Sequence, residues 1–176
     1  TDEHAIAAVV FAPRTGTIIT ASKSSLKYWD AQTGLLLRYV RKPCEGADLT
    51  CMALDRAQRR LALGDSEGGV ILLNASNGTL LRECRRHTNY VSQVVFTASD
   101  QLISTSWDST IMVHAKNVQD IQLNGLLDCH VHGEGCRDVL QVDYSMTFNV
   151  LVTAQADNSV RIWYVVRGGG DKTSLS

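Results

Sequence analysis

The chain has 176 residues, of which 44% are hydrophobic and 20% charged, with 13 glycines and 2 prolines. This is the balance of an ordinary globular domain, and a chain of this length can bury a core without disulfides or a metal. The formal net charge is −1 and like charges form no long run, which excludes the basic surface expected of a nucleic-acid-binding protein.

Five cysteines, an odd number, suggest no disulfide framework, so we expect reduced thiols and a cytoplasmic location. The apolar runs are far shorter than the roughly 18 residues that a membrane helix needs. No charged-then-apolar leader opens the sequence. We therefore expect a soluble chain with no membrane contact, whether it is complete or a piece of a longer protein.

The predicted elements are all β-strands, and they recur in four units. Each unit opens with a strand in which three apolar residues have the same spacing. These residues are Ile6, Val9 and Phe11; Leu49, Met52 and Leu54; Val91, Val94 and Phe96; and Val139, Val142 and Tyr144. The third strands of the four units end at Trp29, Leu73, His114 and Trp163. The three-residue step imitates a helix, but β-branched residues and frequent turns favour strands.

An internal match supports these units. The segment A-Q-T-G-L-L-L-R at residues 31–38 resembles A-S-N-G-T-L-L-R at residues 75–82, an offset of 44 residues. A period near 40 residues is typical of repeats built from four strands. The fourth strands are clear in the first two units, at residues 35–40 and 79–84.

The last two units are irregular. In the third unit, either residues 117–124 form an enlarged loop and the fourth strand follows Gly125, or residues 121–123 form that strand. The fourth unit offers no fourth strand before residues 167–176, which have the composition of a flexible tail.

The units resemble WD repeats, the four-stranded blades of β-propellers, over residues 4–166. The resemblance implies an all-β partial propeller with an incomplete last blade. The blades are expected at roughly residues 4–43, 44–86, 87–130 and 131–166, within one domain of residues 1–166. More loosely, residues 49–55 and 106–110 resemble blades of large WD-repeat proteins of cilia and flagella, which implies a ciliary or flagellar location.

The family implies a hydrogen-bonded structural tetrad of His, Ser or Thr, Asp and Trp in a blade. In the third unit His87, Ser104 and Asp108 take three of these places, and His114 stands where the tryptophan would be. A buried carboxylate requires such partners. Ser104, His87 and Asp108 also have the residue types of a nucleophilic triad, but no G-x-S-x-G elbow accompanies them. We expect a structural role, and no catalytic residue.

The other units match the tetrad less completely. In the fourth unit Thr153, Asp157 and Trp163 match it. The first and second units have Lys23 and Glu67 at the turn position of the aspartate. Blades with an incomplete tetrad are expected to depend on apolar packing.

Trp107 is the main candidate for contact with a partner. It directly precedes Asp108, at the rim of the expected propeller, where an exposed tryptophan is a natural anchor. Packing onto the neighbouring blade is an equal alternative for this side chain. Lys23, Glu67 and Ala156 occupy the same level in the other units and are further candidates.

We expect a non-catalytic protein-interaction scaffold without a cofactor, as part of a larger propeller. Four blades lacking one outer strand leave open ends, which the rest of a ring or a second copy could cover. A purely architectural segment is one alternative. The other is a zinc-dependent module, because four possible ligands lie close together, although not with the spacing of a common closed site. These ligands are Cys129, His130, His132 and Cys136.

Overall fold

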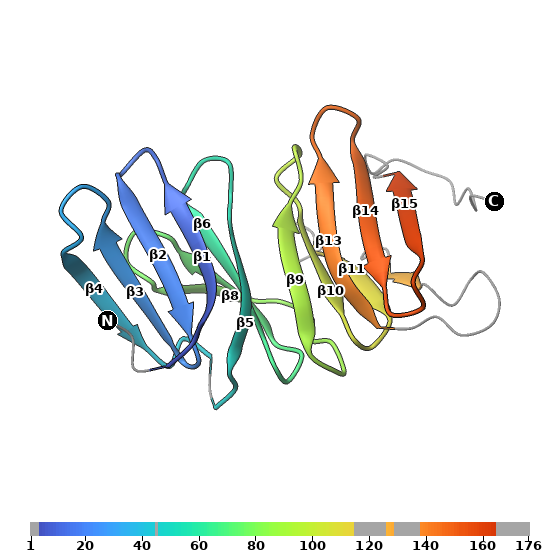
Figure 1. Cartoon of the computed structure of the whole chain (residues 1–176), viewed down its shortest axis with the longest axis horizontal. Helices are drawn as coiled ribbons and strands as arrows, with labels where there is room; N and C mark the ends of the chain where they lie inside the picture. The colour runs from blue at the N-terminus through green and yellow to red at the C-terminus, as the bar shows by residue number, and fades with distance from the viewer. Residues whose placement is uncertain (1–3, 45, 115–125, 129–137, 165–176) are drawn as a thin grey trace.

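The computed structural model describes residues 4–44, 46–114, 126–128 and 138–164, and the backbone in these ranges contains strands and turns but no helix (Figure 1). The strands form four antiparallel sheets that follow one another along the chain. In the part described, no helix has the length and apolarity needed to cross a membrane. The predicted all-β class is therefore confirmed.

Each sheet consists of strands that are consecutive in sequence and adjacent in space. The first sheet contains β1 (Ile6–Ala12), β2 (Thr17–Ser22), β3 (Ser25–Asp30) and β4 (Leu36–Arg41). The second contains β5 (Leu49–Leu54), β6 (Arg60–Asp65), β7 (Val70–Asn74) and β8 (Leu80–Glu83). The third contains β9 (Val91–Phe96), β10 (Leu102–Ser106), β11 (Thr110–His114) and β12 (Leu126–Asp128). The fourth contains, within the described ranges, β13 (Val139–Ser145), β14 (Val150–Gln155) and β15 (Val160–Tyr164).

The fourth strand of the third sheet follows Gly125. β12 pairs with β11, with Leu127 opposite Ile111, which is the first of the two placements expected from the sequence. The alternative strand at residues 121–123 and the predicted tail at residues 167–176 lie outside the described residues.

The repeated A-x-x-G segment encodes one kind of turn between third and fourth strands. Asp30 Oδ1 accepts a hydrogen bond from the backbone N–H of Gln32 at 3.0 Å. The N–H of Gly34 donates to the carbonyl of Asp30 at 2.8 Å, with a φ of +70° at the glycine. Asn74 and Gly78 repeat this bond at 2.8 Å, with a φ of +73°. Glycine is favoured here because it adopts this left-handed conformation without the steric cost that a Cβ atom brings.

A β-bulge in the first strand of every sheet explains the three-residue apolar spacing. The pairing of first and second strands shifts between Ile6 and Ala8, and at the matching place in the other three sheets. A bulge adds one residue, so side chains three positions apart lie on the same face. Val91 and Val94 are accordingly both buried in one core. The spacing reflects a bulged strand.

Each sheet packs against its neighbours through two faces. We call the face that carries Thr20, Leu63, Ser104 or Thr153, one from each second strand, the front face, and the opposite face the back face. At all three junctions the back face of one sheet packs against the front face of the next. Successive sheets therefore stack in one direction (Figure 1).

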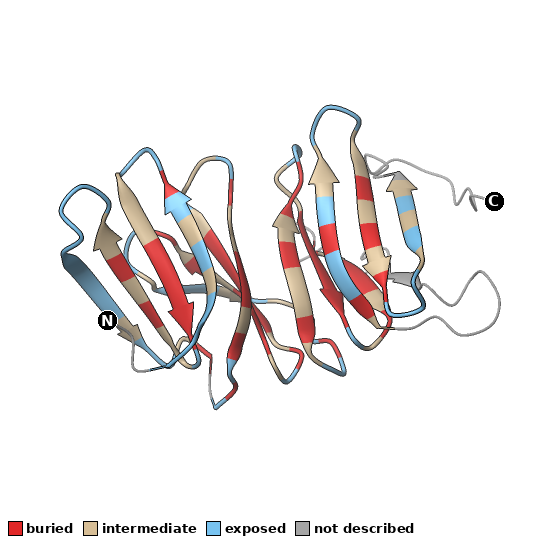
Figure 2. Cartoon of the chain, in the orientation of Figure 1, coloured by how far each residue is buried: buried red, intermediate tan, exposed pale blue. Residues whose placement is uncertain are grey.

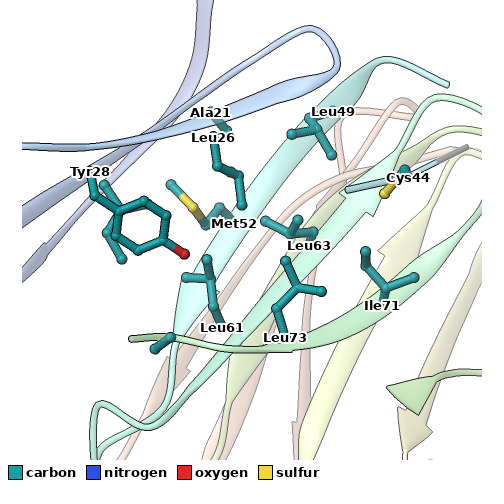
Figure 3. Close-up of a cluster of buried hydrophobic side chains, with 12 residues drawn as sticks. Ala21, Leu26, Tyr28, Cys44, Leu49, Met52, Leu61, Leu63, Ile71 and Leu73 are labelled. Atoms are coloured by element: carbon teal, nitrogen blue, oxygen red, sulfur yellow. The ribbon is translucent and has the colours of Figure 1, made fainter. Parts of the chain in front are cut away.

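Figure 3 shows the junction between the first two sheets. Leu26 and Tyr28, on the back face of the first sheet, meet Leu61, Leu63 and Leu73 on the front face of the second. The four leucines are at most 1% exposed. Burial of each leucine stabilises the fold by about 1.5–3 kcal/mol relative to an exposed side chain.

The other two junctions repeat this arrangement with different side chains. The second includes Ala62 and Val70 against Val94 and Phe96, and the third includes Ile103 and Ile111 against Val142 and Leu151. Among the described residues, no side chain belongs to two of these cores.

The front face of the first sheet and the back face of the fourth sheet have no described sheet against them. Val9 and Phe11 on the first are 62% and 56% exposed, and Val160 and Ile162 on the fourth are 68% and 62% exposed. Figure 2 shows exposed stretches along both end sheets. The first unit thus has the apolar pattern of the other units without their burial, because no described sheet packs against its front face.

Candidate functional site

The third sheet contains a chain of hydrogen-bonded polar side chains. His87 precedes β9, Ser104 lies within β10, and Asp108 lies in the turn between β10 and β11. His87 Nδ1 lies 3.1 Å from Asp108 Oδ2, and His87 Nε2 lies 2.7 Å from Ser104 Oγ. Ser104 Oγ lies 2.8 Å from Nε2 of His114, at the end of β11. The structure thus joins the three sequence-predicted residues to a second histidine.

The carboxylate can only accept hydrogen bonds, and this assigns the protons along the chain. His87 Nδ1–H donates to Asp108, and a neutral imidazole that donates from Nδ1 accepts the hydroxyl proton of Ser104 at Nε2. Ser104 Oγ then accepts from His114, which is neutral with its proton on Nε2. His87, Ser104 and His114 are at most 3% exposed. The buried Ser104 hydroxyl is therefore a structural link and is not presented to a substrate as a nucleophile would be.

Burial and hydrogen bonding shift the pKa values of Asp108 and His114, the two residues at the ends of this row of hydrogen-bonded side chains. Burial raises the pKa of Asp108, but hydrogen bonds from His87 and Thr110 outweigh it and hold this pKa below its usual range. Burial lowers the pKa of His114 to about 4, and His87 and Arg82 add to the effect. At neutral pH Asp108 is therefore a charged carboxylate and His114 is a neutral imidazole.

His114 makes the hydrogen bond that an indole makes in two other sheets. Trp29 Nε1 donates to Thr20 Oγ1 at 3.0 Å, and Trp163 Nε1 donates to Thr153 Oγ1 at 3.0 Å. In each case a ring N–H on the third strand reaches a hydroxyl on the second. The imidazole is thus a functional replacement for the indole in the third sheet.

Asp157 does not join the predicted set in the fourth sheet. Its Oδ1 accepts the N–H of Ser159 at 2.9 Å, and its Oδ2 lies 3.6 Å from a guanidinium nitrogen of Arg161. Asp157 is exposed, whereas Thr153 is buried with Trp163 bonded to it. Of the three residues expected there, the structure joins two.

The second sheet has a buried carboxylate that the sequence analysis missed. Asp65 is 4% exposed, and its Oδ1 accepts the N–H groups of Glu67 and Gly69 at 2.9 and 2.7 Å. Glu67 itself is exposed. The segment D-S-E-G-G at residues 65–69 carried the signal, since an aspartate followed by glycines is typical of a side-chain-stabilised turn.

We call the turns after the four second strands the turn face: residues 23–24, 66–69, 107–109 and 156–159, at the lower edge of Figure 1. Trp107 is 40% exposed on this face. Its ring stacks on Tyr90, with 4.3 Å between centroids and 22° between planes. The N–H of Trp107 also donates to the carbonyl of Tyr90 at 3.0 Å. The half-exposed indole is therefore held in one orientation.

The other predicted contact residues lie in the equivalent turns. Glu67 Oε2 lies 3.2 Å from Arg86 Nη2, and both side chains are more than half exposed. Lys23 lies in a two-residue turn with a φ of +41°. The N–H of Ala156 donates to the carbonyl of Asp138 at 3.0 Å. All four candidates are thus on the turn face, one in each sheet.

The possible zinc ligands at residues 129–136 lie outside the described residues. In the ranges that are described, no group of three or more His, Cys, Asp or Glu side chains could hold a metal ion. Burial raises the pKa of the Cys44 thiol to about 12 and that of Cys51 to about 11. These two thiols are therefore protonated and poor nucleophiles.

The sequence matches a known family of repeats. The family described as WD domain, G-beta repeat, matches residues 78–114 and 123–164, which include most of the third and fourth sheets. The cilia- and flagella-associated protein 337 B of Tetrahymena thermophila is 26% identical over 117 residues. That match includes 66% of this chain and 9% of the relative, so the chain spans less than a tenth of the relative's length.

Two solved structures share the fold. The WD40 propeller domain of Doa1 has a TM-score of 0.76 at 16% identity, over 92% of this chain and 51% of that one. The computationally designed Ika4 protein has a TM-score of 0.74 at 22% identity, over 94% of both chains. The four sheets therefore have the architecture of propeller blades.

Proposed function

We propose that this chain, which matches the WD40 repeat family over residues 78–114 and 123–164 and has the fold of propeller blades, is a non-catalytic scaffold that binds another protein on its turn face. One scaffold of this kind serves many partners, so the site must carry the argument. The observation that carries it is Trp107, an exposed indole held in place by Tyr90. Rigid exposed tryptophans are typical anchors of protein interfaces.

The surroundings of Trp107 support a protein partner. The neighbouring turn of the second sheet presents the exposed ion pair between Glu67 and Arg86. An apolar centre beside a polar, solvent-accessible rim is the usual arrangement of a protein interface. A surface of this kind suits another folded protein or an extended segment of one.

We propose further that the four blades are part of a larger ring. The two end faces expose apolar side chains of the kind that the internal junctions bury. The likeness to a cilia- and flagella-associated protein supports a location in a cilium or flagellum. The free thiols of Cys44, Cys51 and Cys84 support a reducing, cytoplasmic environment.

The proposal is tested by substitution of Trp107 with alanine. The chain is immobilised, ciliary extract is passed over it, and the retained proteins are identified and their affinities measured. Loss of an anchoring tryptophan is expected to weaken binding about 30-fold, equivalent to about 2 kcal/mol. Phe148→Ala is the matched control, because Phe148 is 77% exposed at the opposite ends of the strands.

The folded state of each variant is checked by its thermal melting curve. A protein retained equally by the native chain and by Trp107→Ala would show that the turn face does not bind it through this residue. Loss of binding in both alanine variants would point to a general loss of structure.

A further inference from the structure

The uncovered front face of the first sheet repeats a position that is buried elsewhere. Val9 lies opposite Thr20 in the first two strands. The residues at this position in the next three sheets are Met52, Val94 and Val142, and they are at most 9% exposed. Val9 is 62% exposed. In the described part of the chain, this front face therefore has no back face packed against it.

The uncovered back face of the fourth sheet also exposes a position that is buried in the other sheets. Val160 begins the third strand at the position that Leu26, Val70 and Ile111 hold in the first three sheets. Those three side chains are at most 1% exposed, whereas Val160 is 68% exposed. The back face of the fourth sheet therefore has no front face of another described sheet packed against it.

A hydrogen bond that joins the third and fourth sheets could be repeated between the two uncovered end faces. At the third junction Gln93 Oε1 accepts the backbone N–H of Val142 at 3.0 Å. Gln141 occupies in the fourth sheet the position that Gln93 occupies in the third. Val9 occupies in the first sheet the position of Val142. Packing of the fourth sheet against a first sheet would thus pair Gln141 with the N–H of Val9.

The charges on the two end faces are opposite. Lys27 and Arg41 lie on the front face of the first sheet, beside the exposed ring of Tyr39. The exposed carboxylate of Asp143 lies on the back face of the fourth sheet, in line with Ile162 across the strands. The faces are therefore complementary in charge as well as in apolar surface.

We propose that a second copy of this chain covers both end faces, so that two copies close a ring of eight blades. The inference rests on the proposed larger ring and names what completes it. Each copy supplies one front and one back face, so two identical contacts leave no end uncovered. Closed two-fold dimers are the commonest assemblies, and eight blades lie within the range of closed propellers.

Light scattering after size-exclusion chromatography measures the mass of the 176-residue chain over a range of concentrations. The expected mass is twice the 19.3 kDa of one chain. Val9→Glu and Ile162→Glu each place a charge in the proposed contacts, and each is expected to weaken association at least about 100-fold. Both side chains are exposed in one copy, so both variants should fold. Phe148→Glu, on neither end face, should remain dimeric.

Several results would overturn the proposal. The two-copy ring is refuted if the native chain stays monomeric at high concentration or if it forms open polymers. A dimer that persists in either Val9→Glu or Ile162→Glu would show that a different surface joins the copies. A monomer that still binds a partner through Trp107 would refute the second copy and leave the scaffold intact. A dimer that binds its partner equally well after Trp107→Ala would refute the binding site at Trp107 and leave the second copy intact.

Discussion

Asp108 is the carboxylate on which the polar chain of the third sheet depends. Its oxygens accept hydrogen bonds from His87, from the N–H of Thr88 at 2.9 Å and from the N–H of Thr110 at 2.9 Å. Asp108→Asn replaces one acceptor with an NH₂ group that faces these donors. We expect a loss of about 2–3 kcal/mol in the free energy of unfolding, because buried donors are left unpaired.

Urea denaturation measures this loss, with Asp157→Asn as the control. Asp157 holds the matching turn position in the fourth sheet, but it is exposed and bonds to no histidine among the described residues. Its substitution should change stability much less. Equal losses in the two variants would contradict a bracing role for the buried chain.

His114 makes the stability of the third sheet depend on pH. The pKa of His114 is about 4 in the folded protein and about 6.5 in an unfolded chain. The unfolded state therefore binds the proton more tightly. The contribution is complete above about pH 6.5, falls as the pH decreases, and is lost at about pH 4, a total of about 3 kcal/mol.

His114→Trp is expected to remove this pH dependence. The indole N–H can donate to Ser104 as Trp29 donates to Thr20. A cavity of about 40 Å³ beside His114 can take part of the larger ring. Unfolding free energies at pH 7.5 and pH 4.5 should differ less in the variant than in the native protein. The same difference in both would show that His114 is not the titrating group.

Residue types and spacing predict most of the polar chain but not all of it. His87, Ser104 and Asp108 are recognisable because a repeated strand pattern sets their register. Asp65 was missed because its carboxylate accepts hydrogen bonds from N–H groups within its own turn, a pairing that the repeat pattern does not predict. Glu67 has the right charge at the expected position, yet its side chain is in solvent.

At the scale of the elements, Gly68 in the turn between β6 and β7 is a position that should not tolerate substitution. Its φ is +88°, and a Cβ atom there would lie 2.3 Å from the carbonyl oxygen of His87. Gly68→Ala should therefore destabilise the protein by more than about 2 kcal/mol, through both backbone strain and displacement of His87. Thermal or urea unfolding measures the loss.

Gly16→Ala is the matched control for this turn. Gly16 also has a positive φ, of +63°, but nothing lies within 4 Å of its added Cβ. Only the conformational cost of about 1 kcal/mol should remain. If the two alanine variants were equally stable, the close approach of His87 to Gly68 would have no energetic consequence.

At the scale of strands, the sequence predicts that a strand is present better than it predicts the bulges and the pairing of that strand. The first-strand spacing identifies strands, but the bulge that produces it is visible only in the pairing of Val91 and Val94 with β10. The fourth strand of the third sheet stayed ambiguous because two apolar segments follow a long insertion. Pairing of Ile111 with Leu127 settles its place.

At the scale of the whole molecule, the sequence predicts the number of units but not which faces are covered. Val9 and Val94 are the same residue at the same position, and one is exposed while the other is buried. Burial depends on the neighbouring sheet, so the pattern within a single unit carries no information about it. The exposure of the two end faces therefore depends on which sheets pack against them, and the sequence of one unit does not encode it.

The separation of the three cores has a consequence for how the protein unfolds. Each core joins two adjacent sheets and shares no described side chain with the next core. In such arrays stability is approximately a sum of terms for each unit and for each contact between neighbours. Cooperativity then extends only as far as these contacts allow. The end sheets, each with a single neighbour, are the first to fray, and closure of the ring would convert a linear chain of couplings into a circular one.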